Sequence, residues 1–461
     1  MLSFAKKTDP VAHILMKLSP RLRLSMVIIG AVLIHLSLGT YHTFGNMLPY
    51  MASYMRNYTD PEVKIAHMVW IPTFQGCFPF AMIIGGYLSL HLTPRVAIGI
   101  GCFIMSLGVF LSSYTISYSF NAFFFTYGIM FGLGQGIAYV TAVAVAINWA
   151  PRNIGLVSGI VAGGFGISSS IFAPIQTELI NPKNLEATKD GYFTQEELLQ
   201  SVPNVFFKLS IVYIIMQITG LTVMCNPPSE VEEDESLNKD NTFQKSTNDS
   251  LSISLYEDIE EKDISMLPSD VLRSSTFYLL FVALFCCSFY GNFYYNFYKT
   301  FGETFISDDK FFAYAFSIGS IANALARIGW GFLTDITSFQ VSLSIASCFA
   351  GGLLLTMPLT KWSGQYIYFI WLILMFTCLA ATHALFITAI VKCFGPRYKA
   401  TNYGFLILST TLSGIMLALS SQYWMADLGY TWVFVIVSIF PFTAFILTLL
   451  IHLTPQGDKI I

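Results

Sequence analysis

Charged residues in this sequence are gathered in short clusters, and the stretches between the clusters contain no Asp, Glu, Lys or Arg. A helix needs about 20 residues to cross a hydrocarbon core of about 30 Å. The stretch over residues 96–151 is long enough for two helices, broken near 117–121. The helix that begins in 311–326 has to continue past Arg327 towards Asp335. The pattern therefore predicts twelve membrane-spanning helices. The uncharged stretches are 24–55, 65–94, 96–151, 153–177, 209–229, 274–298, 311–326, 336–360, 362–391, 400–426 and 428–457.

The composition supports the same fold class. Hydrophobic residues make up 54% of the chain and charged residues only 11%. A soluble protein of this length could not cover its surface with so few charges, so apolar side chains must face lipid. Closed β-barrels, the other structure that satisfies the backbone in a bilayer, need short alternating segments. The long unbroken runs instead predict an all-α membrane protein in contact with the lipid bilayer.

Other function classes find little support in the sequence. The net charge of −3 does not indicate nucleic acid as a partner. The eight cysteines lie mostly inside predicted spans, with neither disulfide nor metal spacing. Neither a nucleophile–base pair nor a phosphate-binding loop is visible. We therefore expect no enzyme activity, no metal and no cofactor.

The distribution of Lys and Arg predicts the orientation in the membrane. With the N-terminus inside, cytoplasmic segments contain fifteen of these residues and the opposite side eight. Because positive residues accumulate on the cytoplasmic side, both termini are expected there. The first 22 residues are basic and lack the small-residue cleavage site of a signal peptide. We therefore expect an uncleaved multi-pass protein, located in the plasma membrane.

A single polar stretch divides the chain near its middle. Residues 226–272 are rich in Glu, Asp and Ser and too poor in apolar residues to fold alone. Six predicted helices precede this stretch and six follow it. The expected organisation is a cytoplasmic tail (1–22), a six-helix bundle (23–225), an acidic disordered cytoplasmic linker (226–272), a second six-helix bundle (273–453) and a cytoplasmic tail (454–461).

The two halves carry a weak internal repeat. Residues 85–89 after the second span match residues 329–335 after the eighth, and both lie at the cytoplasmic end of the second helix of their half. Repeated six-helix halves are typical of transporters that alternate access around a site near the midplane. The second copy, with Gly331, Leu333 and Asp335, resembles the signature loop of the Major Facilitator Superfamily. The first copy keeps Arg95 but has Leu90 where the acid is expected.

Three further segments resemble the oxalate:formate antiporter branch of that superfamily and the related monocarboxylate transporters. They are residues 148–166 at the entry of the fifth span, 323–327 in the eighth and 402–404 at the start of the eleventh. The resemblance covers nearly all of the membrane-embedded chain, and it implies a secondary transporter without a cofactor. The residues expected to act in gating are Gly86, Arg95, Arg152, Gly331 and Asp335.

Arg327 is the strongest candidate for substrate binding. It lies inside a predicted span, where a charge costs several kcal/mol unless it faces water or a partner. Its planar guanidinium can hold a carboxylate through two hydrogen bonds, which is the role that the resemblance implies. The alternative is an arginine that snorkels or pairs with Asp335, although two helical turns, about 11 Å, separate the two residues. Asn323 lies one turn earlier on the same face and can orient the arginine or the substrate.

Other polar side chains in the spans are candidates for the same site. His42 and Tyr41 lie in residues 39–45, which are similar to the family's substrate segment in the first span. Tyr290 and Tyr294 are four residues apart, so they share one face of the seventh span. An aromatic residue in a span more often packs against lipid or protein, and that alternative stays open for each of them. The full predicted set is Arg327, Asn323, Tyr41, His42, Tyr290, Tyr294, Gln135 and Tyr403.

The central parts of the predicted spans contain no Asp or Glu. Proton symport therefore lacks an obvious carboxylate carrier, although histidines such as His35 and His42 could replace one. Residues 401–426 also contain no Lys or Arg, whereas the oxalate branch has a second cation there. One buried cation favours a monoanion over a dianion. Exchange or facilitated diffusion is favoured over symport, with a counter-anion or a proton as the coupling partner.

The sequence thus predicts a carrier of a small organic anion, a monocarboxylate, that works by alternating access. Two alternatives stay open. One is a carrier of amino acids or other neutral or zwitterionic solutes, in which Arg327 reads the α-carboxylate. The other is a membrane sensor that binds a solute without transporting it and signals through the acidic linker. Transport assays with a panel of substrates would distinguish the first alternative from a monocarboxylate carrier. Deletion of residues 230–265 would abolish signalling by a sensor but leave transport by a carrier intact.

Overall fold

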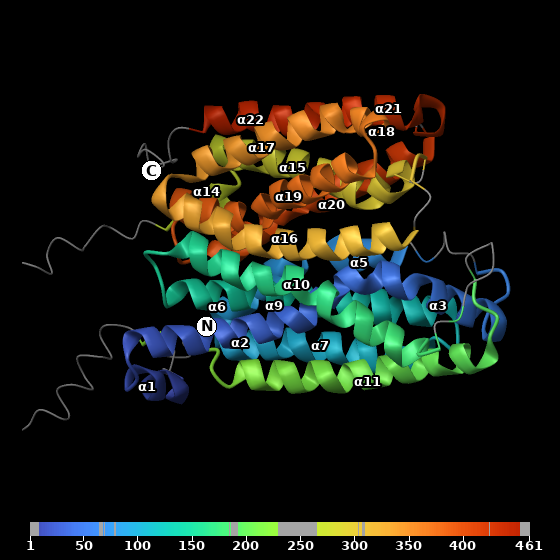
Figure 1. Ribbon diagram of the computed structural model, residues 1–461. Helices are drawn as coiled ribbons and strands as arrows, with labels where there is room; N and C mark the ends of the chain where they lie inside the picture. The colour runs from blue at the N-terminus through green and yellow to red at the C-terminus, as the bar shows by residue number, and fades with distance from the viewer. Residues whose placement is uncertain are drawn as a thin grey trace, which may run out of the picture.

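The computed structural model describes residues 9–63, 68, 70–77, 80–183, 185, 192–228, 265–302, 304–306, 309–423 and 425–451. The helices run side by side in two groups, which Figure 1 shows as a blue-to-green half and a yellow-to-red half. Most of the predicted linker lies outside the described residues. Residues 226 and 265 flank it at one end of the molecule, which we call the linker side; the opposite end is the far side.

The N-terminal half contains six spans, some of them built from more than one element. Residues 20–58 form one span that passes through a 3-10 segment, η1. In this segment the hydroxyls of Thr40 and Thr43 donate to backbone carbonyls three residues earlier, at 2.8 and 2.7 Å, which favours the tighter winding. The elements are α1 (Pro10–Met16), α2 (Pro20–Leu38), η1 (Gly39–Thr43), α3 (Phe44–Tyr58), α5 (Trp70–Cys77), α6 (Ala81–His91), α7 (Pro94–Thr115), α8 (Phe120–Phe123), η2 (Phe124–Met130), α9 (Phe131–Asn148), α10 (Ile154–Ile180) and α11 (Glu196–Leu221).

The C-terminal half contributes the remaining spans. Within the described residues, ten helices are long and apolar enough to cross a membrane. α16 and α20, with 28 and 25 residues, are long enough but carry more polar side chains, and they complete the predicted twelve. The elements are α14 (Pro268–Val271), α15 (Ser275–Gly302), α16 (Asp309–Ile336), α17 (Phe339–Thr356), η4 (Met357–Leu359), α18 (Thr360–Ser363), α19 (Gln365–Phe394), α20 (Lys399–Tyr423), α21 (Met425–Val437) and α22 (Ile439–Leu450).

The predicted span boundaries agree with the helices at the two uncharged stretches whose lengths did not fit a single span. The long stretch 96–151 breaks between α7 and α8, and α16 continues through Arg327 and Asp335 to Ile336. The predicted tail and linker contain more structure than expected at their ends. α1 forms within residues 1–22, and α14 forms within 226–272, where the backbone N–H of Met266 donates to the carbonyl of Phe394 at 3.0 Å.

The halves meet along α10 with α16 and along α6 with α20. Glycines make both contacts possible on the linker side. A Cβ at Gly331 would collide with the backbone of Gly155, and a Cβ at Gly86 would lie 2.7 Å from the Cα of Thr401. Because side chains are absent at these positions, the helix backbones approach closely. The halves are therefore held together on the linker side.

Asp335 adds a charged contact between the halves at the same end. Its carboxylate accepts the backbone N–H of Gly155 at 2.8 Å and that of Leu156 at 2.7 Å. These amides belong to the start of α10, where N–H groups have no partner within the helix and where the helix dipole favours an anion. The acid predicted to act in gating thus binds a helix end in the other half and not Arg327.

Replacing Asp335 with Asn should loosen the linker side, because the carboxylate charge that holds the start of α10 is removed. Hydrogen bonds to a charged group contribute about 1.5–3 kcal/mol each. In a cysteine-depleted background we expect a cysteine at buried Ser158 to react with thiol reagents at least threefold faster in Asp335→Asn. Glu178→Gln, which removes an exposed carboxylate from the other end of α10, is the matched control. Equal labelling rates in Asp335→Asn and the control would contradict this function for Asp335.

Candidate functional site

Arg327 lies on α16, the helix that packs along α10 of the other half, and only 1% of its surface is exposed. Its Nε donates to the Oδ1 of Asn323 at 3.0 Å, and its Nη1 donates to the carbonyl of Ala162 at 2.9 Å. Within the described part of the chain, no carboxylate lies within 4 Å of the guanidinium. These contacts use two of its five N–H groups, and three remain for a ligand.

Asn323 is held in place by a second hydrogen bond. Its Nδ2 donates to the carbonyl of Phe376 on α19 at 2.7 Å. The amide therefore presents its oxygen to the Nε of Arg327, one helical turn away. This arrangement orients the arginine, which is one of the two roles predicted for Asn323.

Glycines on α10 make room for the guanidinium. A Cβ at Gly166 would lie 3.2 Å from both Cζ and Nε of Arg327. One at Gly159 would lie 2.5 Å from the backbone oxygen of Arg327. The glycine-rich segment of α10 thus lets the charge reach the carbonyl of Ala162 in the opposite half, so this segment does more than pack helices.

His42 contributes an imidazole to the same region from η1. Its ring packs edge-on against Phe165 of α10, with ring centres 5.1 Å apart, and it also faces Tyr295 of α15 at 6.4 Å. The adjacent Tyr41 ring lies 4.9 Å away. The Nε2 of His42 is buried without a hydrogen-bond partner among the described residues. His42 therefore places an available nitrogen where the two halves meet, close enough to Arg327 for electrostatic interaction.

Three tyrosines from different helices lie in the region of the guanidinium. Tyr139 of α9, Tyr295 of α15 and Tyr403 of α20 are each close enough for electrostatic interaction with Arg327. His35 of α2 lies behind them, with its ring 4.6 Å from that of Tyr139 and its Nδ1 2.9 Å from the carbonyl of Ala31. The site thus combines one cation with hydroxyls from both halves and two imidazoles from the N-terminal half.

The sequence predicted some of these residues and missed others. Arg327, Asn323, His42 and Tyr403 lie near one another, whereas the hydroxyl of Tyr41 points to Gly76 of α5. Tyr139 and Tyr295 were missed. Tyr139 could have been found one helical turn after Gln135, which was selected, and Tyr295 lies next to Tyr294, which was also selected.

Tyr290 and Tyr294 lie elsewhere, inside the C-terminal half. Tyr290 lies beside the thiols of Cys287 and Cys378. The ring of Tyr294 stacks on Tyr298 at 6.2 Å and meets Phe376 edge-on. Their spacing of four residues does place them on one face of α15, but this face packs against other helices of the C-terminal half. The adjacent Tyr295, rotated by about 100° around the helix, instead faces the ring of His42 in the other half.

Gln135 lines a small cavity of about 20 Å³ between the halves. Gln75 and Gly404 line the same cavity, and the Nε2 of Gln75 donates to the carbonyl of Tyr127 at 2.6 Å. The Oε1 atoms of both glutamines lack a hydrogen-bond partner among the described residues. This volume is enough for about one water molecule. Gln135 therefore lies between the halves, in a compartment lined by other residues than those around Arg327.

The two arginines predicted to act in gating have different surroundings. Arg95 forms an ion pair with Asp9 at 3.2 Å and donates to the carbonyls of Met224 and Thr222 at 3.1 and 3.3 Å. It therefore ties α1 and the end of α11 to the start of α7, all within the N-terminal half. Arg152 is exposed in the turn between α9 and α10.

Comparison with known proteins identifies the family. The Major Facilitator Superfamily model matches residues 27–418, and the chain belongs to this superfamily. Apicoplast pyruvate carrier 1 of Toxoplasma gondii is 24% identical over 458 residues, covering 86% of this chain and 82% of the carrier. Human monocarboxylate transporter 12 is 32% identical over 116 residues, covering 25% of this chain and 22% of that protein. These relatives confirm the resemblance to monocarboxylate transporters that the motifs indicated.

Solved structures confirm the fold. The transporter FucP in its outward conformation matches with a TM-score of 0.65 and 15% identity, covering 92% of this chain and 98% of that one. The proton:xylose symporter XylE matches with a TM-score of 0.66 and 9% identity, covering 96% and 98%. At such identities the likeness concerns the fold alone, which is that of a multi-pass membrane transporter.

Gly166→Ala should weaken substrate binding with little effect on folding. The added methyl group would displace the guanidinium by a few tenths of an ångström, and overpacking of this kind costs about 1 kcal/mol or more. We expect the half-saturating substrate concentration to rise about fivefold in a transport assay. Gly329→Ala on α16, where a Cβ meets nothing within 4 Å, is the control and should leave it unchanged. Equal behaviour of the two variants would contradict a substrate contact at Arg327.

Proposed function

We propose that this protein transports small monocarboxylates across a membrane by alternating access, with Arg327 as the residue that binds the carboxylate. The observation that carries the proposal is a buried guanidinium between the two halves, with no carboxylate within 4 Å among the described residues. A bound anion would offset the cost of burying this charge. The relatives named as pyruvate and monocarboxylate carriers support the same class of cargo.

The surroundings of Arg327 suit a monoanion. The carboxylate would accept two hydrogen bonds from the free side of the guanidinium, while Asn323 keeps the plane of the fork fixed. Hydroxyls of Tyr139, Tyr295 and Tyr403 and the Nε2 of His42 would contact the remaining polar atoms of the cargo. A second carboxylate would have no second cation to compensate it.

The contacts on the linker side correspond to one of the two states that alternating access requires. Release of the cargo to that side would require α10 to separate from α16 and α6 from α20. The contacts that must break are the close backbone approaches at Gly331 and Gly86 and the hydrogen bonds of Asp335. Since Arg327 bonds to Ala162 across the same interface, the cargo and the carbonyl of Ala162 would share one guanidinium, and separation of the halves would break the second of these contacts.

Orientation, location and coupling are parts of the proposal. The linker side is the cytoplasmic side, both termini face the cytoplasm, and the protein resides in the plasma membrane. The cargo exchanges with a counter-anion or diffuses downhill, because the described interior offers no carboxylate beside Arg327 to carry a proton. The protein performs transport and no covalent chemistry. Detection of a tagged protein only in an organellar membrane would overturn the location.

Arg327→Gln should abolish transport, because a neutral amide cannot compensate a buried carboxylate. Loss of a buried charge partner costs about 2–5 kcal/mol, so uptake of labelled pyruvate, lactate or formate into proteoliposomes should fall at least thirtyfold. Arg327→Lys keeps the charge without the planar fork and should retain a small part of the uptake. Lys208→Gln, at an exposed lysine of α11, is the control. Wild-type uptake by folded Arg327→Gln would overturn the proposal, and uptake of alanine in place of these acids would favour the amino-acid alternative.

Exchange predicts trans-stimulation in the same vesicles. Preloading with unlabelled pyruvate should speed the entry of labelled pyruvate severalfold, and an imposed inward proton gradient should have little effect. The converse result, strong stimulation by the proton gradient and none by preloading, would show symport. In that case His42, whose ring faces Tyr295 of the other half, would be the first residue to replace.

A further inference from the structure

His35 of α2 is fully buried, and one nitrogen of its ring lacks a partner. The other nitrogen, Nδ1, lies 2.9 Å from the carbonyl oxygen of Ala31, one helical turn earlier. A carbonyl oxygen only accepts hydrogen bonds, so the proton of the neutral ring is on Nδ1. Nε2 then carries a lone pair and can only accept a hydrogen bond. Among the described residues, no group donates one to it.

The ring of His35 stays neutral because a positive charge already occupies this part of the interior. His35 is close enough to Arg327 for electrostatic interaction. In the described part of the chain, no ion pair includes His35. A second buried charge of the same sign, without a partner of opposite sign, would be costly. The side chain therefore offers a hydrogen-bond acceptor that needs a neutral donor.

A chain of neighbouring rings connects His35 to the site around Arg327. The ring of His35 lies 4.6 Å from that of Tyr139, and Tyr139 meets Phe165 edge-on at 5.2 Å. Phe165 in turn meets His42 edge-on at 5.1 Å. Tyr139 and His42 are themselves close enough to Arg327 for electrostatic interaction. The four rings thus form one cluster of the N-terminal half beside the guanidinium.

We propose that His35 determines which monocarboxylates the carrier prefers, because its Nε2 accepts a hydrogen bond from a hydroxyl group of the cargo. This inference rests on the proposed function, since Arg327 has to hold the carboxylate for the hydroxyl to be placed. The preferred cargo is a 2-hydroxy acid, whose hydroxyl is fixed on the carbon next to the carboxylate and loses little freedom on binding. The oxo group of a 2-oxo acid has only lone pairs and cannot donate to Nε2.

Other donors suit this nitrogen less well. An ammonium group would bring a second positive charge beside Arg327, and no carboxylate in the described residues lies within 4 Å of the guanidinium to compensate it. A water molecule can donate to Nε2, but holding it there costs entropy. The hydroxyl of a bound acid is already held by the carboxylate. A cargo that leaves the buried acceptor unpaired should therefore bind about tenfold more weakly.

Uptake of four acids of similar size tests the preference. Lactate, propionate, pyruvate and alanine differ only at carbon 2, which carries a hydroxyl group, hydrogen, an oxo group and an ammonium group respectively. With each acid labelled in turn, we expect wild-type proteoliposomes to show a half-saturating concentration about tenfold lower for lactate than for the other three. Equal values for lactate and propionate, or a lower value for alanine, would overturn the inference and leave transport itself intact. Uptake of none of the acids would overturn the proposed function as well.

Two variants of His35 separate hydrogen bonding from packing. His35→Phe keeps a ring against Tyr139 but removes the acceptor, so the ratio of the propionate and lactate values should fall from about ten to about one. His35→Gln, whose amide oxygen can accept a hydrogen bond, should restore part of the ratio. Arg327→Gln should instead reduce the uptake of both acids. An unchanged ratio in His35→Phe would show that the ring serves packing alone and would overturn the inference.

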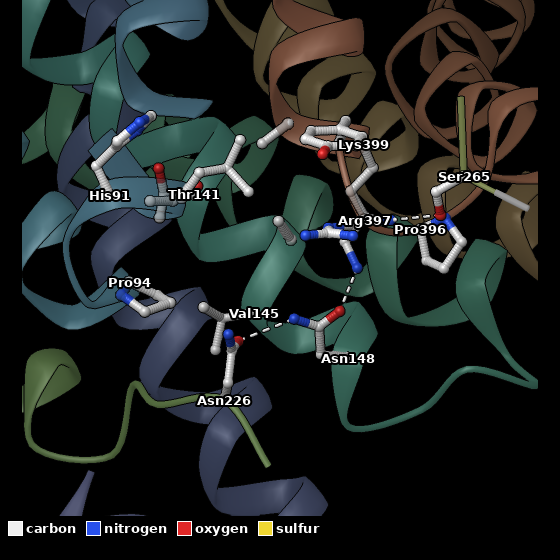
Figure 2. A pocket seen from close by; sticks show the side chains of 15 residues that line it. His91, Pro94, Thr141, Val145, Asn148, Asn226, Ser265, Pro396, Arg397 and Lys399 are labelled. Carbon is white, nitrogen blue, oxygen red and sulfur yellow. Dashed lines mark hydrogen bonds between the residues drawn. The ribbon is translucent and has the colours of Figure 1, made fainter. Parts of the chain in front are cut away.

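His91 provides a matched control. Its Nδ1 also lies 2.9 Å from the carbonyl oxygen four residues earlier, that of Tyr87, but the ring is exposed at the end of α6. It lines a separate cavity of about 720 Å³ on the linker side, together with the basic residues Arg397 and Lys399 (Figure 2). His91→Phe should keep the wild-type ratio of the propionate and lactate values. A ratio near one in this variant would contradict a specific role for the buried histidine.

Discussion

The charge of Arg327 has to be compensated inside a membrane-spanning bundle, and much of the local structure follows from this requirement. The guanidinium reaches across the interface to the carbonyl of Ala162, and Asn323 fixes its orientation from one turn away. The glycines of α10 are needed because a Cβ at Gly166 or Gly159 would press on the side chain or the backbone of Arg327. Within the described residues these neutral contacts leave the positive charge uncompensated, which is why an anionic cargo is the simplest account of the site.

The same interface explains how binding at one place can move a whole half. On the linker side α10 and α16 are joined by glycine contacts and by Asp335, and Arg327 is joined to α10 further along the same pair of helices. A change in the contacts of the guanidinium would therefore act on the interface between α10 and α16, which is closed in one of the two states of the proposed alternating access. The second pair, α6 with α20, lacks the equivalent carboxylate and has a basic cavity in its place.

The sequence predicted the fold well because lipid allows few solutions. Long uncharged stretches predict spans, and a lone arginine such as Arg327 inside a span indicates a candidate site, because burial of its charge is costly. The sequence was a poorer guide to which tyrosines lie between the two halves. Helical spacing shows that Tyr290 and Tyr294 share a face, but it does not show whether that face points towards the other half, and Tyr295 does so instead. The ion pair of Arg95 with Asp9 was also beyond prediction, because it depends on the folding of α1.

A structure of the protein with pyruvate bound tests the central claim most directly. The account predicts the carboxylate within about 2.7–2.9 Å of the guanidinium of Arg327, held through two hydrogen bonds, with Asn323 unchanged beside it. Pyruvate bound at another site, while the guanidinium keeps only its contacts to Asn323 and Ala162, would contradict it.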